Sequence, residues 1–321
     1  MAIKKSGKFT GVLVPTLTPF REDLSPDSHR LIQLCQWQLA RGVDGLAVFG
    51  TTSEGNSLSV GERNALIDRL IEAGIPANRL MPGTGACALP DAIELTRHAV
   101  SRGAGGVLVL PPFYYKNQTD DGFYAYFSEI IQRVGDRNFS LYLYHFPQLS
   151  AAPISLALIA RLLKTYPETL AGVKDSSGNW EGTKAMIAEF PELAIFPSSE
   201  SRLFEGLGLG AAGCISASAN IQPAAIRKLI DVHASTEARQ WHDRIAAVRA
   251  IIEQYPAIPA LKSILAHQTG DKAWATLRPP LTPLPTERQV ELVRSLNSLV
   301  DFDPIRLEQS VRSSRESVTA G

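Results

Sequence analysis

Short runs of hydrophobic residues alternate with longer amphipathic stretches along almost the whole chain. Nearly continuous apolar runs are typical of parallel strands that are buried on both faces. The amphipathic stretches between them are typical of helices that cover such a sheet. This alternation predicts an α/β fold, a closed (β/α)8 or TIM barrel. The eight runs cover residues 11–14, 45–49, 80–82, 106–110, 140–144, 171–173, 193–196 and 213–215.

Local signals support the predicted helices. Ser59 and Glu62 have the spacing of a capping box, and Pro90 suits the first turn of another helix. Asp120 and Asp121 place negative charge where a further helix begins. Four more helical patterns follow the eighth run, and because one helix completes a barrel, the others predict an appended C-terminal helical layer. They cover residues 224–234, 237–254, 259–267 and 286–298.

These patterns predict a single domain over residues 1–321. We expect the barrel to cover residues 9–234 and the C-terminal helices to cover residues 235–300. The tail, residues 301–321, is rich in Ser and Arg. We expect this tail to be flexible or to dock on a neighbouring copy.

The composition is that of an ordinary globular protein. Hydrophobic residues make up 45% and the formal net charge is zero, so we expect no nucleic-acid partner. No run approaches the roughly 18 apolar residues of a membrane helix, and the N-terminus lacks the apolar stretch of a signal peptide. The few, widely spaced cysteines, Cys35, Cys87 and Cys214, suit a reducing compartment. We therefore expect a cytoplasmic location and no membrane partner.

Two kinds of cofactor site can be set aside. Residues 208–213 match the glycine pattern of dinucleotide-binding loops, but that pattern must follow a strand and begin a helix. Here it follows a helical stretch and precedes the last strand, so close packing explains the glycines better. The six histidines show no metal-ligand spacing. We therefore expect neither a cofactor nor a metal, which disfavours a metal-dependent barrel hydrolase.

The most informative residue is Lys174. Active sites of barrels lie at the C-terminal ends of the strands, and Lys174 directly follows the run 171–173. An amine is nucleophilic only when it is unprotonated, a form that apolar surroundings favour, and it can then form an imine with a ketone. On position alone a structural role fits as well, in which Lys174 pairs with Asp175 or Glu200 or extends to the rim.

Hydroxyl groups at other strand ends strengthen the catalytic interpretation. Tyr144, a threonine such as Thr51, and either Tyr114 or Tyr115 can relay protons to a buried amine, because phenols and alcohols both donate and accept. The neighbouring Thr52 can present a hydroxyl and an N–H group to a carboxylate. Taken singly, each of these residues also has a structural explanation as a core or turn residue.

Six short motifs are spread over the chain. They are Gly11-x-x-x-Pro15-x-x-Thr18-Pro19-Phe20, Gly50-Thr51-Thr52-x-Glu54, Tyr144-x-x-Pro147, Gly172-Val173-Lys174-Asp175-Ser176-Ser177-Gly178, Gly213-x-Ile215-Ser216 and Ile258-Pro259-Ala260-Leu261-Lys262. In content and order they resemble the dihydrodipicolinate synthase / N-acetylneuraminate lyase family, from about residue 9 to about residue 284. The resemblance implies a class I aldolase, an enzyme that works through a Schiff base on a lysine.

The resemblance also implies a role for each matching residue. Lys174 would be the Schiff-base lysine, and Tyr144 the phenol above it that transfers protons. Thr51 would be the relay threonine. Thr52 would hold the carboxylate of the substrate, and Ile215 would lie near that carboxylate and the imine.

A further tyrosine of the family is lent by one subunit to the active site of its neighbour. It corresponds to Tyr114, while Tyr115 remains an alternative because the loop differs in length by one residue. Either assignment implies a homo-oligomer, a dimer or the tetramer that is usual in the family.

Other positions depart from the family's synthases. Those carry an arginine where this chain has Leu149, and a leucine cannot bind the carboxylate of an aldehyde substrate. Pro-x-Leu-Ser is similar to the sialate lyases, although His145 stands where asparagine is usual, and Ser53 stands where glycine is common. We expect the segment Ser198-Ser199-Glu200-Ser201 to face the distal end of the substrate, with Glu200 binding hydroxyl groups.

We therefore predict a metal-free lyase or aldolase whose small-molecule substrate is pyruvate or a related 2-oxo acid. Retro-aldol cleavage of a hydroxylated 2-oxo acid is favoured. The same imine would serve two alternatives, a 4-hydroxy-tetrahydrodipicolinate (dihydrodipicolinate) synthase of lysine biosynthesis and a dehydratase of 2-keto-3-deoxy sugar acids. An alternative of another class is a non-catalytic sensor of 2-oxo acids, which the joint presence of Lys174, Tyr144 and Thr51 disfavours.

Overall fold

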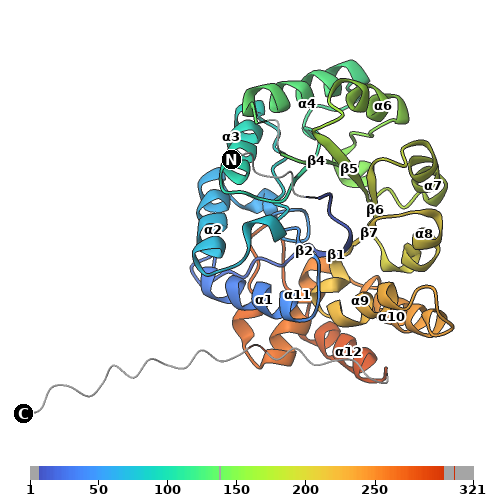
Figure 1. Cartoon of the computed structure of the whole chain (residues 1–321). Helices are drawn as coiled ribbons and strands as arrows, with labels where there is room; N and C mark the ends of the chain where they lie inside the picture. The colour runs from blue at the N-terminus through green and yellow to red at the C-terminus, as the bar shows by residue number, and fades with distance from the viewer. Residues whose placement is uncertain (1–6, 137–138, 300–306, 308–321) are drawn as a thin grey trace, which may run out of the picture.

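Parallel strands form the centre of the molecule and helices surround them (Figure 1). The computed structural model describes residues 7–136, 139–299 and 307. The strands form two hydrogen-bonded parallel sheets, in the orders β2-β1-β7 and β3-β4-β5-β6. They are β1 (Gly11–Val14), β2 (Gly45–Leu46), β3 (Val107–Val109), β4 (Leu141–His145), β5 (Leu170–Asp175), β6 (Ala194–Pro197) and β7 (Gly213–Ile215).

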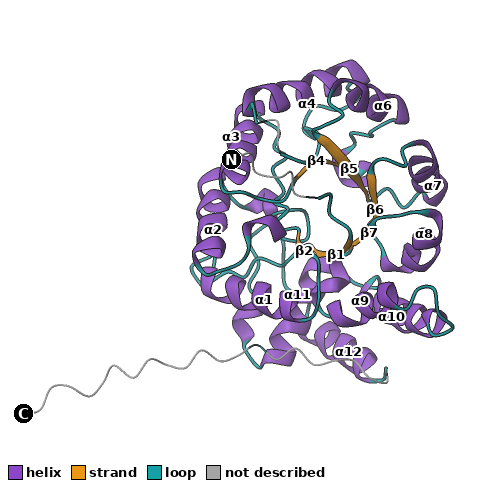
Figure 2. Ribbon diagram, in the orientation of Figure 1, coloured by secondary structure: helices purple, strands orange, loops and turns teal. Residues whose placement is uncertain are grey.

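Backbone contacts join the two sheets into a ring. On one side the segment 80–83 lies between β2 and β3, where Leu80 bridges to Leu46 and Gly83 to Leu108. On the other side the amide of Ala212, just before β7, donates to the carbonyl of Ile195 in β6 at 2.9 Å. The predicted (β/α)8 barrel is thereby confirmed, and Figure 2 shows the strands enclosed by helices.

Two of the predicted strands are wrong in detail. Residues 80–82 pair through isolated bridges rather than as a regular strand, and Pro82 has no N–H group to donate to a neighbour. The strand predicted over residues 45–49 ends at Leu46. Beyond it the chain enters a turn in which Phe49 has a φ of 61°.

The glycine-rich stretch 208–213 connects a helix to a strand. Gly210 ends α8 (Leu203–Leu209) with a φ of 100°, a conformation that favours glycine. Gly213 begins β7, and a Cβ atom there would lie 1.8 Å from the carbonyl oxygen of Gly11 in β1. Close packing therefore explains these glycines, as the sequence context indicates.

The helices around the barrel begin where their local signals predict. The capping box of Ser59 and Glu62 is present at α2, and Pro90 lies in the first turn of α3. Asp120 is the first residue of α4, after the N-cap Thr119. These helices are α1 (Ser28–Ala40), α2 (Val60–Glu72), α3 (Leu89–Ser101), α4 (Asp120–Val134), the short α5 (Pro147–Ser150), α6 (Leu156–Thr165), α7 (Trp180–Glu189), α8 and α9 (Pro223–Asp231).

Three further helices form the predicted C-terminal layer. They are α10 (Ala238–Ile252), α11 (Ala257–Thr269) and α12 (Thr286–Asn297), and Figure 1 shows them packed beside α1 and α9. They share a hydrophobic cluster of their own with Leu17, Leu34 and Trp37 from the barrel. Apart from Leu307, the predicted tail 301–321 lies outside the described residues. Within the described part of the chain, no helix is long and apolar enough to cross a membrane.

Side chains fill the interior of the barrel. Leu13, Met81, Tyr142 and Phe196 from different parts of the ring form one buried cluster. The hydroxyl of Tyr142 accepts a hydrogen bond from the amide of Phe9 at 2.8 Å, and burial raises the pKa of this phenol to about 12. Chemistry is therefore expected at the end of the barrel rather than along its axis.

Candidate active site

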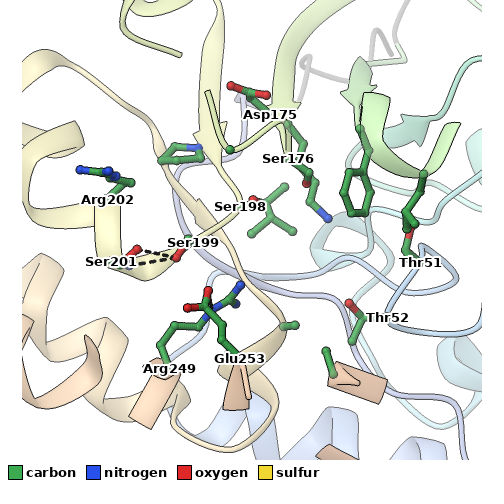
Figure 3. A pocket seen from close by; sticks show the side chains of 18 of the residues that line it. Thr51, Thr52, Asp175, Ser176, Ser198, Ser199, Ser201, Arg202, Arg249 and Glu253 are labelled. Atoms are coloured by element: carbon green, nitrogen blue, oxygen red, sulfur yellow. Dashed lines mark hydrogen bonds and ion pairs between the residues drawn. The ribbon is translucent and has the colours of Figure 1, made fainter. Parts of the chain in front are cut away.

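A cavity of about 560 Å³ opens at the C-terminal ends of the strands (Figure 3). Its wall includes the last residues of β5, β6 and β7, and it extends to the C-terminal helices. This is the position that the barrel fold predicts for an active site. The predicted site residues in its wall are Thr51, Thr52, Tyr144, Leu149, Lys174, Ser198 and Ile215.

Lys174 and Tyr144 are neighbours because β5 pairs with β4. The register places Lys174 directly beside Tyr144, and the Lys174 Nζ atom lies 4.2 Å from the centroid of the tyrosine ring. Lys174 is only 5% exposed, yet no ion pair involves it among the described residues. The carboxylate of Asp175 instead accepts hydrogen bonds from the Ser177 amide, at 2.9 Å, and from the Thr183 hydroxyl. The structural alternative, in which Lys174 pairs with Asp175 or Glu200, therefore does not hold.

The phenol of Tyr144 is hydrogen-bonded to the hydroxyl of Thr51. Its Oη atom lies 3.2 Å from the Oγ1 atom of Thr51, and either group can donate. Thr51 belongs to the turn that follows β2, which brings the two residues together although 93 positions separate them in the sequence. A proton can therefore pass between these groups at the end of the cavity that holds Lys174.

A buried ion pair anchors the loop that carries Thr51 and Thr52. Glu54 adopts a left-handed conformation with a φ of 55°, and its carboxylate pairs with Lys262 of α11, which is fully buried. The Lys262 Nζ atom also donates to the carbonyl of Thr276 at 2.8 Å. Burial lowers the pKa of Lys262 to about 8 in spite of Glu54, and burial raises the pKa of Glu54. The C-terminal layer therefore helps to set the position of the two threonines.

Tyr114 and Tyr115 lie away from this cavity. Each is 73% exposed, and their rings contact one another edge to face with centroids 5.4 Å apart. Neither lies in the cavity wall of its own chain. A role in catalysis would need a second copy of the chain, so the relay tyrosine and the choice between the two residues stay predictions.

Glu200 does not face the cavity, and the prediction that it binds substrate hydroxyl groups is wrong. Its side chain is 0% exposed. The carboxylate accepts hydrogen bonds from the hydroxyls of Ser216 and Ser218 and from the Gln222 amide at 3.2 Å. Its oxygens are therefore occupied within the protein, behind the wall of the cavity.

The two positions that depart from the family's synthases differ in exposure. Leu149, in α5, is 62% exposed and lies in the cavity wall. His145 is buried, and its Nδ1 atom accepts a hydrogen bond from the Ile154 amide at 3.0 Å. Burial lowers the pKa of His145, which Asp175 only partly opposes, so it is not a replacement for the missing positive charge.

Several cavity residues were not predicted from the sequence. Arg249 and Glu253 reach the cavity from the end of α10, a helix that follows the barrel in the chain. Arg202 and Trp180 line it as well, next to Ser199 and Ser201 of the segment expected to face the distal end of the substrate. A search of strand ends misses the first two, because their position depends on how α10 packs. Among the described residues, no three His, Cys, Asp or Glu side chains are grouped so that they could hold a metal ion.

Comparison with known proteins identifies the family. A model of the Dihydrodipicolinate synthetase family matches residues 8–299. The chain belongs to this family. It is therefore a lyase of the class I aldolase type.

Relatives of the family cover nearly the whole chain. An uncharacterized DapA-like lyase of Chloroflexus aurantiacus is 35% identical over 284 residues, 88% of this chain and 94% of the relative. The 4-hydroxy-tetrahydrodipicolinate synthase of Methanococcoides burtonii is 30% identical over 298 residues, 91% of this chain and 98% of the relative. The crystal structure of dihydrodipicolinate synthase from Agrobacterium tumefaciens has a TM-score of 0.84 and 31% identity, and the match covers 91% of this chain and all of that one.

Proposed function

We propose that this protein is a Schiff-base lyase that acts on pyruvate or a related 2-oxo acid, with retro-aldol cleavage of a hydroxylated 2-oxo acid as its favoured reaction. The observation that carries the proposal is the buried Lys174, which has no ion-pair partner among the described residues and lies beside Tyr144. A solved family member, YagE of Escherichia coli, has 26% identity and a TM-score of 0.83 over 91% of this chain and 98% of its own, and its structure was determined in complex with pyruvate.

In the proposed reaction the Lys174 Nζ atom attacks C2 of the 2-oxo acid. The ketone oxygen leaves as water with a proton from the Tyr144 phenol, and an iminium ion and a phenolate form. The iminium ion draws the electron pair of the C3–C4 bond towards nitrogen, while the Tyr144 phenolate accepts the proton of the C4 hydroxyl and an aldehyde is released. Protonation of the resulting enamine at C3 and hydrolysis then release pyruvate and restore the amine.

The hydroxyl pair of Thr51 and Tyr144 supports this proton transfer. Their oxygen atoms lie 3.2 Å apart, so the Thr51 hydroxyl can donate a hydrogen bond to Tyr144 while the phenol is deprotonated. Thr52 and Ile215 line the same cavity, and the carboxylate of the substrate would lie against them. An assembly of two or four copies, in which Tyr114 reaches a neighbouring site, and a cytoplasmic location are part of this proposal.

Trapping the imine tests the proposal directly. Incubation with pyruvate and borohydride should add a reduced pyruvate adduct to Lys174, because an imine is reducible and a free amine is not. Peptide mass spectrometry locates the adduct, and Lys174→Arg should remove it. Lys184→Arg is a matched control, because Lys184 lies in α7 outside the cavity wall. An unmodified Lys174 in saturating pyruvate would contradict the proposed reaction and would favour a sensor.

The reaction as proposed uses no metal and no cofactor. The imine supplies the electron sink that a class II aldolase takes from its metal ion. Prolonged chelation should therefore leave turnover unchanged. Loss of turnover on chelation, with recovery when a divalent metal is restored, would overturn this part of the proposal.

The second candidate is 4-hydroxy-tetrahydrodipicolinate synthase, the activity named for several relatives. The observation against it is Leu149, which stands in the cavity wall where the family's synthases carry an arginine. A dehydratase of 2-keto-3-deoxy sugar acids shares the imine chemistry and is distinguished by its product.

A further inference from the structure

The cavity extends well beyond the end that holds Lys174. Its volume of about 560 Å³ is in the range that accommodates ligands much larger than a three-carbon acid. In Figure 3, Ser199 and Ser201 lie on the side of the cavity opposite Thr51 and Thr52. A longer 2-oxo acid bound to Lys174 would therefore extend towards Ser199 and Ser201. These residues lie outside the six sequence motifs that resemble the family.

Arg249 and Glu253 form a hydrogen-bonded ion pair in the wall of this cavity. The Arg249 Nε atom donates to Glu253 at 2.7 Å, and its Nη1 atom lies 3.4 Å from the Ser216 hydroxyl and 3.8 Å from Glu200. No hydrogen bond within the described part of the chain uses its Nη2 atom. Figure 3 shows the ends of both side chains close together and pointing towards the middle of the cavity. The pair thus offers a ligand both N–H donors and a carboxylate acceptor.

The charges around this pair do not suit an anion. Two carboxylates, Glu200 and Glu253, face the single guanidinium of Arg249, so the local balance is negative. Arg202 stacks on Trp180 with 5.4 Å between its Cζ atom and the ring centroid, and it lies 3.7 Å from Glu205. Its charge is therefore partly balanced already. A hydroxyl group, which both donates and accepts, matches the Arg249–Glu253 pair without bringing a further charge.

We propose that Arg249 and Glu253 bind hydroxyl groups on the tail of the substrate, so that the enzyme selects a 2-oxo acid with a neutral polyhydroxylated tail over one whose tail ends in a carboxylate. The proposal rests on the Schiff-base function above and gives it a substrate class. It assigns to Glu253 the role that the sequence predicts for Glu200. Ser199 and Ser201, whose hydroxyls lie 2.7 Å apart, offer further partners on the same side.

The test compares two substrates of equal length, a 3-deoxy-2-oxohexonate with a neutral tail and a 3-deoxy-2-oxohexarate with a terminal carboxylate. The wild-type enzyme should favour the neutral tail at least about tenfold in kcat/KM. Glu253→Gln should lower kcat/KM for the hexonate about tenfold, because a charge-assisted hydrogen bond to a hydroxyl is lost. The same variant should raise kcat/KM for the hexarate, because a negative charge is removed.

The matched control is Glu237→Gln, which changes an exposed glutamate at the opposite end of α10. This variant should leave both kcat/KM values unchanged. Trapping by pyruvate, which has no hydroxylated tail, should be equal in the wild type and in Glu253→Gln. A wild type that prefers the hexarate, or a Glu253→Gln variant with unchanged values, would overturn the inference even if pyruvate is trapped. Failure of trapping in the wild type would overturn the proposed function and this inference together.

Discussion

The two ends of the cavity are built in different ways. The end around Lys174 consists of residues at or just after strands, where β4 and β5 place Tyr144 and Lys174 side by side. The distal end is completed by Arg249 and Glu253, which come from a helix added after the barrel. The barrel therefore determines the chemistry at the first end. The packing of an appended layer completes the second end, and the same layer also anchors the loop of Thr51 and Thr52 at the first end through Lys262.

Removing the phenol of Tyr144 is the strongest test of the first end. Tyr144→Phe should lower kcat about 100- to 1000-fold for every substrate, because the proton transfer in each reaction uses the same group. Borohydride should still trap pyruvate on Lys174, although more slowly. Steady-state kinetics with two substrates, together with adduct mass, measures both effects.

A control lies two residues earlier on the same strand. Tyr142→Phe removes a hydroxyl inside the barrel that accepts from the Phe9 amide. It should cost on the order of 1 kcal/mol of folding free energy and leave kcat within a factor of two. If Tyr142→Phe and Tyr144→Phe lowered kcat equally, the phenol of Tyr144 would have no special role.

Breaking the Glu54–Lys262 pair tests how strongly the appended layer supports the end around Lys174. Lys262→Met leaves the Glu54 carboxylate buried without its partner, which typically destabilises a protein by about 3–5 kcal/mol. It should also raise KM for pyruvate, because the loop of Thr51 and Thr52 loses its anchor. Urea unfolding and pyruvate kinetics measure these effects.

The double variant Glu54→Gln with Lys262→Met should recover part of the lost stability, because no unpaired charge remains. Lys272→Met, at an exposed position in the same C-terminal layer, should change neither quantity. Full stability of Lys262→Met would mean that water reaches Glu54 and that the pair does not anchor the loop.

Adding charge at the cavity wall tests the choice between the two candidate functions. Leu149→Arg should raise the condensation of pyruvate with aspartate semialdehyde about tenfold from a low level, because a guanidinium can bind the carboxylate of that aldehyde. Trapping of pyruvate on Lys174 should not change. A wild-type kcat of about 10 per second for this condensation, a rate typical of enzymes, would refute the argument from Leu149.

The smallest expected effect concerns how the C-terminal part is held to the barrel. Arg278 forms a hydrogen-bonded ion pair with Glu62 of α2, and this pair lowers the pKa of Glu62 to about 2. Because the pKa in the folded state lies below the unfolded value, the pair contributes its full stability above about pH 4.5 and loses it as the pH falls towards 2.

Glu62→Gln should therefore flatten the fall in stability over this pH range. The difference should be on the order of 1 kcal/mol, since the pair is partly exposed to solvent. Thermal unfolding at several pH values measures it, and Glu72→Gln on the exposed face of the same helix is the control. Parallel pH profiles for the wild type and Glu62→Gln would show that Arg278 does not stabilise the Glu62 carboxylate.

The sequence by itself determined the barrel and the end of the cavity around Lys174. Buried parallel strands need continuous apolar runs, and the residues that follow such runs must lie at one end of the barrel, so Lys174, Tyr144, Thr51 and Thr52 could be placed from their order alone. Only the tertiary structure decided the distal end. Glu200 follows a strand as well, yet the hydroxyls of Ser216 and Ser218 hold its carboxylate behind the wall.

No sequence pattern marks Arg249 and Glu253 as site residues, because charged residues are ordinary on the polar face of an amphipathic helix. Their place in the cavity follows from how α10 packs against the loop after β6 and the turn after β7. Such packing depends on contacts between segments far apart in the chain, and no local pattern encodes which polar residue of a helix will meet a cavity.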